Sequence, residues 1–126
     1  MDMRTPLGKV RGLGSAKDGT EHFWVQRVSA VAMVPLAVFF VIFLIRYAGA
    51  PYAEVVGALS NPIVAVLFGL MVIAGLIHMR IGVQEIIADY VHNEGLKFLS
   101  LMLNTFFAML IGGLCLFAVL KIAFVG

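Results

Sequence analysis

The chain has 126 residues, enough for one domain of ordinary size, so we expect no division into several domains. Apolar residues make up 62% of the sequence and charged residues 13%, whereas soluble proteins contain about 45–50% and about 25%. A globule of this size has too little interior for so much apolar surface, and disorder or nucleic-acid binding would require far more charge. The net charge is only +2. This composition predicts an integral membrane protein that binds no nucleic acid.

The chain divides into a polar start and an apolar remainder. Residues 1–20 are polar and rich in glycine, and we expect them to form a cytoplasmic N-terminal tail that a partner orders. Residues 21–126 contain three apolar stretches, each close to the length of about 20 residues that a helix needs to cross a bilayer. They lack the alternation of β-barrel strands, and in lipid only helices and closed barrels satisfy their backbone groups. The predicted fold is therefore all-α, a three-helix membrane bundle with helices at about 22–48, 61–91 and 96–124.

Local signals predict where these helices begin and end. Asn61-Pro62 is typical of a helix start, because Asn caps free backbone N–H groups and Pro lacks the N–H that would be unpaired there. Gly49 predicts the end of the first helix, and Gly95 predicts the end of the second. Pro35 lies inside the first helix and should kink it, which neighbouring helices tolerate in a membrane.

The positive charges predict how the helices are oriented. If the N-terminus and the connection near residues 80–97 share one side of the membrane, that side holds seven Lys and Arg residues and the other side holds two. The two sets are Arg4, Lys9, Arg11, Lys17, Arg27, Arg80 and Lys97 against Arg46 and Lys121. We therefore expect a multi-pass protein of the bacterial inner membrane with a cytoplasmic N-terminus and an external C-terminus. The first apolar run begins too late and is too long for a cleavable signal peptide, so none is expected.

Ionisable residues are costly at membrane depth, so those of the second helix are candidate functional residues. At 100° per residue, Glu85 and Asp89 lie within about 20° of the direction of His78, and the three side chains form one stripe. Gly75 and Gly82 lie about one turn before and after His78, and small residues let a flat ring system approach the backbone, as in a haem site between helices. The glycines equally suit close helix packing. The histidine is also consistent with a proton relay or a polar contact.

A carboxylate–phenol pair and an arginine near the cytoplasmic boundary are further candidates. Asp89 and Tyr90 form a carboxylate–phenol pair suited to hydrogen bonding and proton relay at a lipid-soluble acceptor, although an interfacial Tyr is also a common membrane anchor. Arg27 is either a positive-inside residue or a clamp for an anion such as a haem propionate.

The remaining histidines and the one cysteine limit what this chain can do alone. His22 and His92 lie too far from His78 to bind the same iron, so a haem with two His ligands needs its second ligand from another chain. Cys115 stands alone, which excludes a disulfide framework or a cysteine-based metal cluster within the chain. The sequence therefore predicts a partner, most simply another small helical membrane protein.

The run that starts at His78 resembles the signature of the small hydrophobic membrane-anchor subunit of succinate dehydrogenase (succinate:quinone oxidoreductase, respiratory complex II). The shared positions are His78, Gly82, Gln84, Asp89 and Tyr90. The start of the first helix, from Arg27, is similar to the first span of that family. Length, three helices and an inside N-terminus agree as well.

This resemblance implies an anchor that does not oxidise succinate itself but attaches an iron–sulfur subunit and a flavoprotein subunit to the membrane. It implies pairing with a second, companion membrane-anchor subunit. His78 would be one axial ligand of a haem b shared with that companion, and Arg27 would lie near its propionates. Tyr90 would hydrogen-bond a carbonyl of ubiquinone or another quinone, and Asp89 would serve the same site and its protons. The complex would carry electrons from succinate to quinone in the tricarboxylic acid cycle and the respiratory chain.

Three alternatives remain at this point. A fumarate reductase anchor would serve the reverse reaction with similar architecture. A small proton-coupled membrane transporter would use His78, Glu85 and Asp89 as a proton path. A structural assembly subunit of a respiratory complex would use the stripe only for packing. The family pattern assigns no role to Arg80 or Glu85.

Overall fold

The computed structural model describes residues 5–12 and 18–126. Five helices follow one another along the chain: α1 (Pro6–Arg11), α2 (Asp18–Tyr47), α3 (Tyr52–Leu59), α4 (Pro62–Tyr90) and α5 (Glu94–Phe124). Three of them, α2, α4 and α5, are long and apolar enough to cross a membrane. The described residues contain no strand. The all-α, three-helix membrane fold is therefore confirmed.

The boundaries of the long helices follow most of the local signals. The Asn61 side chain accepts a hydrogen bond from the Ile63 N–H at 2.9 Å and caps α4. Gly49, just beyond the end of α2, has φ 79°, a left-handed conformation that Gly adopts without strain. The expectation for Gly95 was wrong, because α4 ends at Tyr90 and Gly95 lies in the first turn of α5. The Asn93 side chain caps that turn by accepting from the Leu96 N–H at 3.0 Å, so Gly95 belongs to the start of the third long helix and not to the end of the second.

Two short helices were not predicted. In α1, Thr5 accepts a hydrogen bond from the Gly8 N–H at 3.0 Å and Gly12 closes the helix with φ 65°. The expected tail therefore contains a capped helix, and its other residues 1–4 and 13–17 lie outside the described residues. The second short helix, α3, follows Pro51 and fills the connection between α2 and α4.

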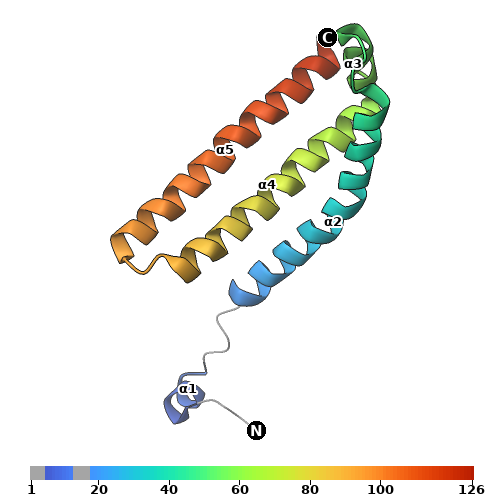
Figure 1. Ribbon diagram of the computed structural model, residues 1–126. Coiled ribbons are helices and arrows are strands. Elements are labelled where there is room, and N and C mark those ends of the chain that lie inside the picture. The colour runs from blue at the N-terminus through green and yellow to red at the C-terminus, as the bar shows by residue number, and fades with distance from the viewer. Residues whose placement is uncertain (1–4, 13–17) are drawn as a thin grey trace.

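The three long helices lie side by side in one layer, with α4 in the middle (Figure 1). α4 packs against both α2 and α5, whereas α2 and α5 hardly touch each other. Within the described part of the chain, the buried apolar side chains are Leu36, Ile81 and Ala108, and Ser29 is the buried polar one. A layer one helix thick leaves both faces of α4 open to lipid or to a partner.

Aromatic side chains join α2 to α4 in the half of the layer away from the N-terminus. The Phe68 ring of α4 lies edge-on to Phe39 and Phe43 of α2, with centroids 5.5 Å and 4.8 Å away. Such edge contacts contribute about 0.5–1.5 kcal/mol each beyond their area burial. Pro35 lies inside α2, which curves along its length (Figure 1). The expected bend at this helix is thus consistent with the missing N–H of proline.

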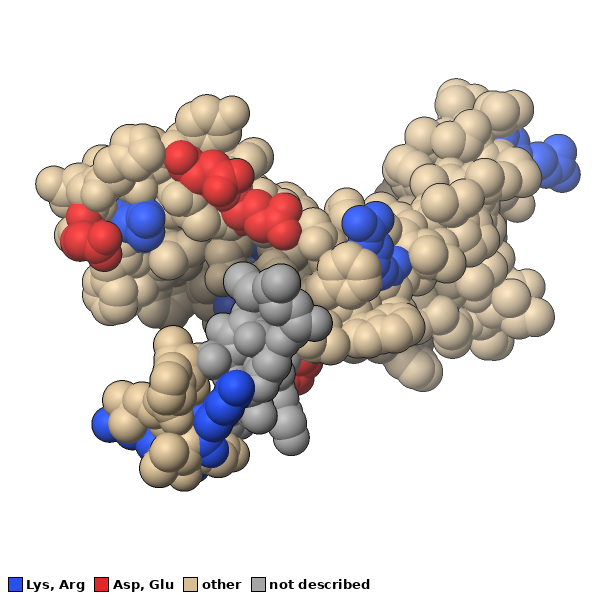
Figure 2. All heavy atoms as spheres, turned by 90° about the horizontal axis from the view of Figure 1, so that it is seen from below, with Lys and Arg blue, Asp and Glu red and all other residues tan. Residues whose placement is uncertain are grey.

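Charged side chains are few on the outside of the molecule. Seen from the end at which α4 and α5 are joined, acidic side chains gather over that junction and most of the remaining surface is uncharged (Figure 2). The exposed acidic residues of this region are Glu85, Asp89 and Glu94. A polar end on an apolar layer fits a helix end that emerges from the membrane.

Candidate functional site

His78 is half-buried on the side of α4 that faces α2, and it meets the buried Ser29 there. The Ser29 Oγ lies 3.4 Å from the His78 Nδ1 atom. The same hydroxyl donates a hydrogen bond to the Gln26 carbonyl at 2.9 Å, within its own helix. Only 6% of Ser29 is exposed. One nitrogen of the imidazole thus lies at the long end of hydrogen-bonding distance from a buried hydroxyl of the neighbouring helix.

Glu85, two turns further along α4, faces α2 as well. Its Oε2 accepts a hydrogen bond from Gln26 Nε2 at 3.2 Å, and its Oε1 lies 3.6 Å from His22 Nε2. We call the five residues that face each other here the polar seam: His22, Gln26 and Ser29 of α2, with His78 and Glu85 of α4. Their spacing of three, four and seven residues places each set on one helix face.

Asp89 does not join the polar seam, although it lies in the same direction on the helix wheel. Both Asp89 and Tyr90 are exposed at the end of α4, and Tyr90 is 77% exposed. Within the described part of the chain, no hydrogen bond or ion pair involves either side chain. They lie about 16 Å along the helix axis from His78. Their polar atoms are available to a ligand or to another subunit.

The two glycines near His78 have different surroundings. A Cβ at Gly75 would lie 3.6 Å from the sulfur and the terminal methyl of Met33, so a side chain of α2 packs over this position. A Cβ at Gly82 would meet nothing within 4 Å. Gly75 therefore serves the packing of α2 on α4, while the surface at Gly82 is open. The role of both glycines beside a haem stays a prediction.

Arg27 lies near the start of α2 but outside the polar seam. Its guanidinium carbon lies 5.0 Å from the centroid of the Phe23 ring, a cation–π contact one turn away on the same helix. Two residues along a helix correspond to a rotation of about 200°, so Arg27 leaves α2 on the side opposite Ser29. It lines a shallow groove with Trp24 and Val28.

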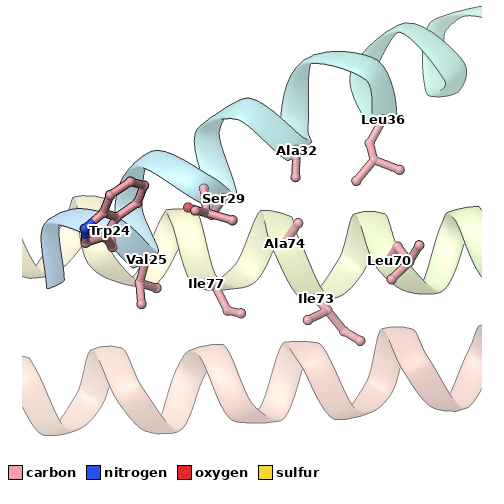
Figure 3. Close-up of a pocket in the computed structure, with 10 residues that line it drawn as sticks. Trp24, Val25, Ser29, Ala32, Leu36, Leu70, Ile73, Ala74 and Ile77 are labelled. Carbon is pink, nitrogen blue, oxygen red and sulfur yellow. The ribbon is translucent and has the colours of Figure 1, made fainter. Parts of the chain in front are cut away.

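A larger apolar groove of about 440 Å³ lies between α2 and α4 (Figure 3). Its walls are Trp24, Val25, Val28, Ser29, Ala32 and Leu36 of α2, with Leu70, Ile73, Ala74 and Ile77 of α4. Ala32 and Leu36 point from α2 towards α4, and Ala74 points from α4 towards α2 (Figure 3). Ser29 carries the one hydroxyl of this lining, so the groove borders the polar seam at the contact with His78.

Arg80 belongs to the other side of α4, where α5 packs. Its Nε donates to Thr105 Oγ1 at 3.4 Å, and its backbone carbonyl accepts from Asn104 Nδ2 at 3.0 Å. These contacts join α4 to α5, and side-chain hydrogen bonds between membrane helices contribute about 0.6–2 kcal/mol.

Sequence reasoning missed the α2 members of the polar seam and the two α5 residues that bind Arg80. The spacing of His22, Gln26 and Ser29 at i, i+4 and i+7 was a readable signal for one polar helix face. It could not tell which residues of another helix that face would meet.

The described residues contain no group of three or more His, Cys, Asp or Glu side chains that could hold a metal ion. His78 nevertheless fits a haem that takes one ligand from this chain. One ring nitrogen is hydrogen-bonded and oriented, as in most metal-ligating histidines. The open surface at Gly82, one turn away, leaves room for a flat group beside it.

Three membrane-spanning helices with a polar seam between two of them define a small multi-pass membrane protein. Residues 1–112 match the family model described as succinate dehydrogenase/fumarate reductase transmembrane subunit, and the chain belongs to this family. The resemblance seen from His78 to Tyr90 is thereby confirmed.

Several relatives are similar over most of the chain. The succinate dehydrogenase hydrophobic membrane anchor subunit of Paracoccus denitrificans is 37% identical over 86 residues, which cover 68% of this chain and 67% of the relative. The protein of the same name from Rickettsia bellii is 28% identical over 96 residues, with 76% and 77% covered. The succinate dehydrogenase membrane anchor subunit of Reclinomonas americana is 28% identical over 90 residues, with 69% and 75% covered. No solved structure gives a significant match.

Proposed function

We propose that this chain is the small hydrophobic membrane-anchor subunit of a succinate dehydrogenase. It attaches a flavoprotein subunit and an iron–sulfur subunit to the cytoplasmic side of the bacterial inner membrane, and it packs against a second anchor subunit. The observation that carries the proposal is the family match over residues 1–112, together with relatives that are named as succinate dehydrogenase anchors. The single helix layer supports it, because both faces of α4 are free for a second anchor.

In this assembly His78 would be this chain's ligand to a haem b, and the second anchor would supply the other ligand. The half-buried imidazole held by Ser29 and the open surface at Gly82 support this role. When bound, the haem supplies a one-electron redox centre between the two anchors. The family resemblance alone assigns Arg27 to a haem propionate, because its side chain leaves α2 on the side opposite Ser29.

Tyr90 and Asp89 form this chain's part of the quinone-reduction site. Their exposure at the end of α4 supports contact with a quinone and with the iron–sulfur subunit. The Tyr90 O–H donates a hydrogen bond to a quinone carbonyl, which stabilises negative charge as electrons arrive. The Asp89 carboxylate takes a proton from the cytoplasmic side and passes it towards the same oxygen. Two electrons from succinate and two protons convert the quinone to quinol.

The main competing proposal is a fumarate reductase anchor, because the family description covers both enzymes. The transporter hypothesis required His78, Glu85 and Asp89 to act as one path. It has less support, since Glu85 and His78 are engaged with α2 while Asp89 lies apart from them.

Purification of the tagged chain from its native membranes in a mild detergent tests the proposal. We expect three further subunits, a haem b band in the reduced-minus-oxidised spectrum, and succinate–quinone reductase activity. Faster quinol–fumarate reduction than succinate oxidation would favour the fumarate reductase. A chain that purifies without flavoprotein, iron–sulfur subunit and haem would contradict both.

A further inference from the structure

We propose that Ser29 is a positioning residue that holds His78 with its proton on Nδ1 and so presents Nε2 as the atom that binds a metal. This inference rests on the proposed function, in which His78 is a haem ligand. It concerns a residue of α2 that the sequence pattern did not single out.

The Ser29 hydroxyl has a single proton, and its direction determines what the hydroxyl can offer to His78. A hydroxyl offers one O–H donor and two lone pairs. Two acceptors compete for the proton: the Gln26 carbonyl oxygen at 2.9 Å and the His78 Nδ1 at 3.4 Å. The first distance lies in the usual range for O–H···O bonds, whereas the second is long for a hydroxyl donor and for a ring N–H donor alike, so the contact with the carbonyl is the stronger of the two. The proton therefore points to the carbonyl, and the oxygen turns a lone pair towards the imidazole.

The direction of the Ser29 proton determines which ring nitrogen of His78 carries the hydrogen. An Nδ1 lone pair facing an oxygen lone pair would repel it, so Nδ1 carries the hydrogen and donates to Ser29 Oγ. A neutral imidazole has one N–H, so Nε2 keeps its lone pair. A metal needs this free lone pair, and hydrogen bonding of the opposite nitrogen is what orients metal-ligating histidines.

Burial makes this contact selective. Ser29 is only 6% exposed, so water competes poorly for its oxygen. The neighbouring turn fixes how closely the helices approach, because Met33, one turn beyond Ser29, packs over Gly75, one turn before His78. The oxygen and the ring are thus held by two rigid helices.

Loss of the Ser29 oxygen should weaken the imidazole as a ligand. An N–H that donates to an oxygen makes the imidazole a stronger electron donor, which favours the oxidised iron. Loss of such a partner typically lowers metal affinity about 10- to 100-fold. For Ser29→Ala we expect about a tenfold smaller preference for oxidised over reduced iron, which raises the haem midpoint potential by about 59 mV for one electron.

The test uses the complete complex with Ser29→Ala, Ser29→Thr, Ser29→Cys and His78→Ala, and measures haem per chain, midpoint potential and the low-spin spectrum. The matched control is Ser60→Ala, because Ser60 also donates to the carbonyl one turn before it, at 2.8 Å, but lies at the far end of the layer. We expect a raised potential and lower haem content in Ser29→Ala, recovery in Ser29→Thr, and no change in Ser60→Ala.

The outcomes separate this inference from the proposed function. Wild-type potential and haem content in Ser29→Ala, with haem lost in His78→Ala, overturn the role of Ser29 and leave His78 as the ligand. Unchanged haem in His78→Ala overturns the ligand assignment itself. If Ser29→Ala does not assemble, Ser29→Cys decides, because its thiol keeps the shape but is a weak acceptor. A wild-type potential in Ser29→Cys then contradicts the inference.

Discussion

Gly112 of α5 lies directly against Leu76 of α4. A Cβ at position 112 would come within 2.8 Å of a terminal methyl of Leu76, closer than two carbon atoms can pack. Gly112 is buried, whereas the next residue, Gly113, is exposed and has nothing within 4 Å of its Cβ direction. The contact between α4 and α5 therefore depends on one glycine and not on its neighbour.

This difference predicts the behaviour of two alanine variants. Gly112→Ala forces the terminal methyl of Leu76 to shift, and because this methyl is the end of a flexible side chain, the cost should lie at the low end of the about 1–3 kcal/mol typical of overpacking. We expect a lower thermal stability of the detergent-solubilised complex, followed by loss of its haem absorbance or activity on heating. Gly113→Ala is the matched control and should behave as wild type. Equal stability of the two variants would show that Leu76 relaxes without cost.

Glu85 should be replaceable by glutamine with little loss of function. The carboxylate is 47% exposed and its partner His22 is 38% exposed, and exposed ion pairs contribute about 0–1 kcal/mol. Glutamine keeps an oxygen for the Gln26 amide. We expect succinate–quinone reductase activity within about fivefold of wild type, which corresponds to about 1 kcal/mol. If the Glu85→Gln complex assembles normally but loses activity, the hypothesis of a proton path through Glu85 would gain support.

Tyr90→Phe should impair quinone reduction specifically. Loss of the hydrogen-bond donor to a quinone carbonyl should raise the barrier to quinone reduction by about 1–3 kcal/mol. This corresponds to about a 5- to 150-fold loss of turnover. Phenylalanine keeps the ring, so haem content and assembly should not change. The measurement compares the steady-state rate of quinone reduction with the rate of succinate oxidation by a water-soluble artificial acceptor. The second rate should stay nearly the same as in wild type. Equal quinone rates in both proteins would leave Tyr90 as an interfacial anchor.

The orientation of the chain is open to a direct test. Seven Lys and Arg residues on the side of the N-terminus against two on the other predict that the N-terminus lies in the cytoplasm and the C-terminus outside. Single cysteines placed at the two ends, in a background with Cys115 replaced by serine, are labelled in intact and in permeabilised cells. Labelling of the N-terminal cysteine in intact cells would invert the topology and move Tyr90 away from the cytoplasm.

Much of the fold was predictable, because the signals that indicate each long helix lie within its own sequence. Uninterrupted apolar runs indicated the three spans, and Asn61 and Gly49 indicated two of their ends through capping and backbone conformation. The short helices α1 and α3 were not predicted, because six or eight residues are too few to show a clear helical period. Gly95 misled because a capped helix start at Asn93 followed so closely.

The site was predictable only along one helix. The wheel placed His78 and Glu85 on one face of α4, and the structure agrees. It also placed Asp89 there, but Asp89 lies beyond the part of α4 that meets the polar seam. Periodicity carries no information about the register of α2 against α4, so neither Ser29 beside His78 nor Met33 over Gly75 was visible beforehand.

The arrangement of the helices in one layer also determines the stability of a chain that is synthesised in excess over the other subunits and remains unassembled. Lipid tails cover the apolar faces of such an orphan copy at no cost, since they are as apolar as the side chains themselves. Polar groups that a partner would cover, such as the half-buried imidazole of His78, are left without solvation there. An unassembled copy would therefore insert normally and still be recognised for membrane proteolysis through polar groups that its partners normally cover. Its cellular half-life would report how fast the second anchor arrives.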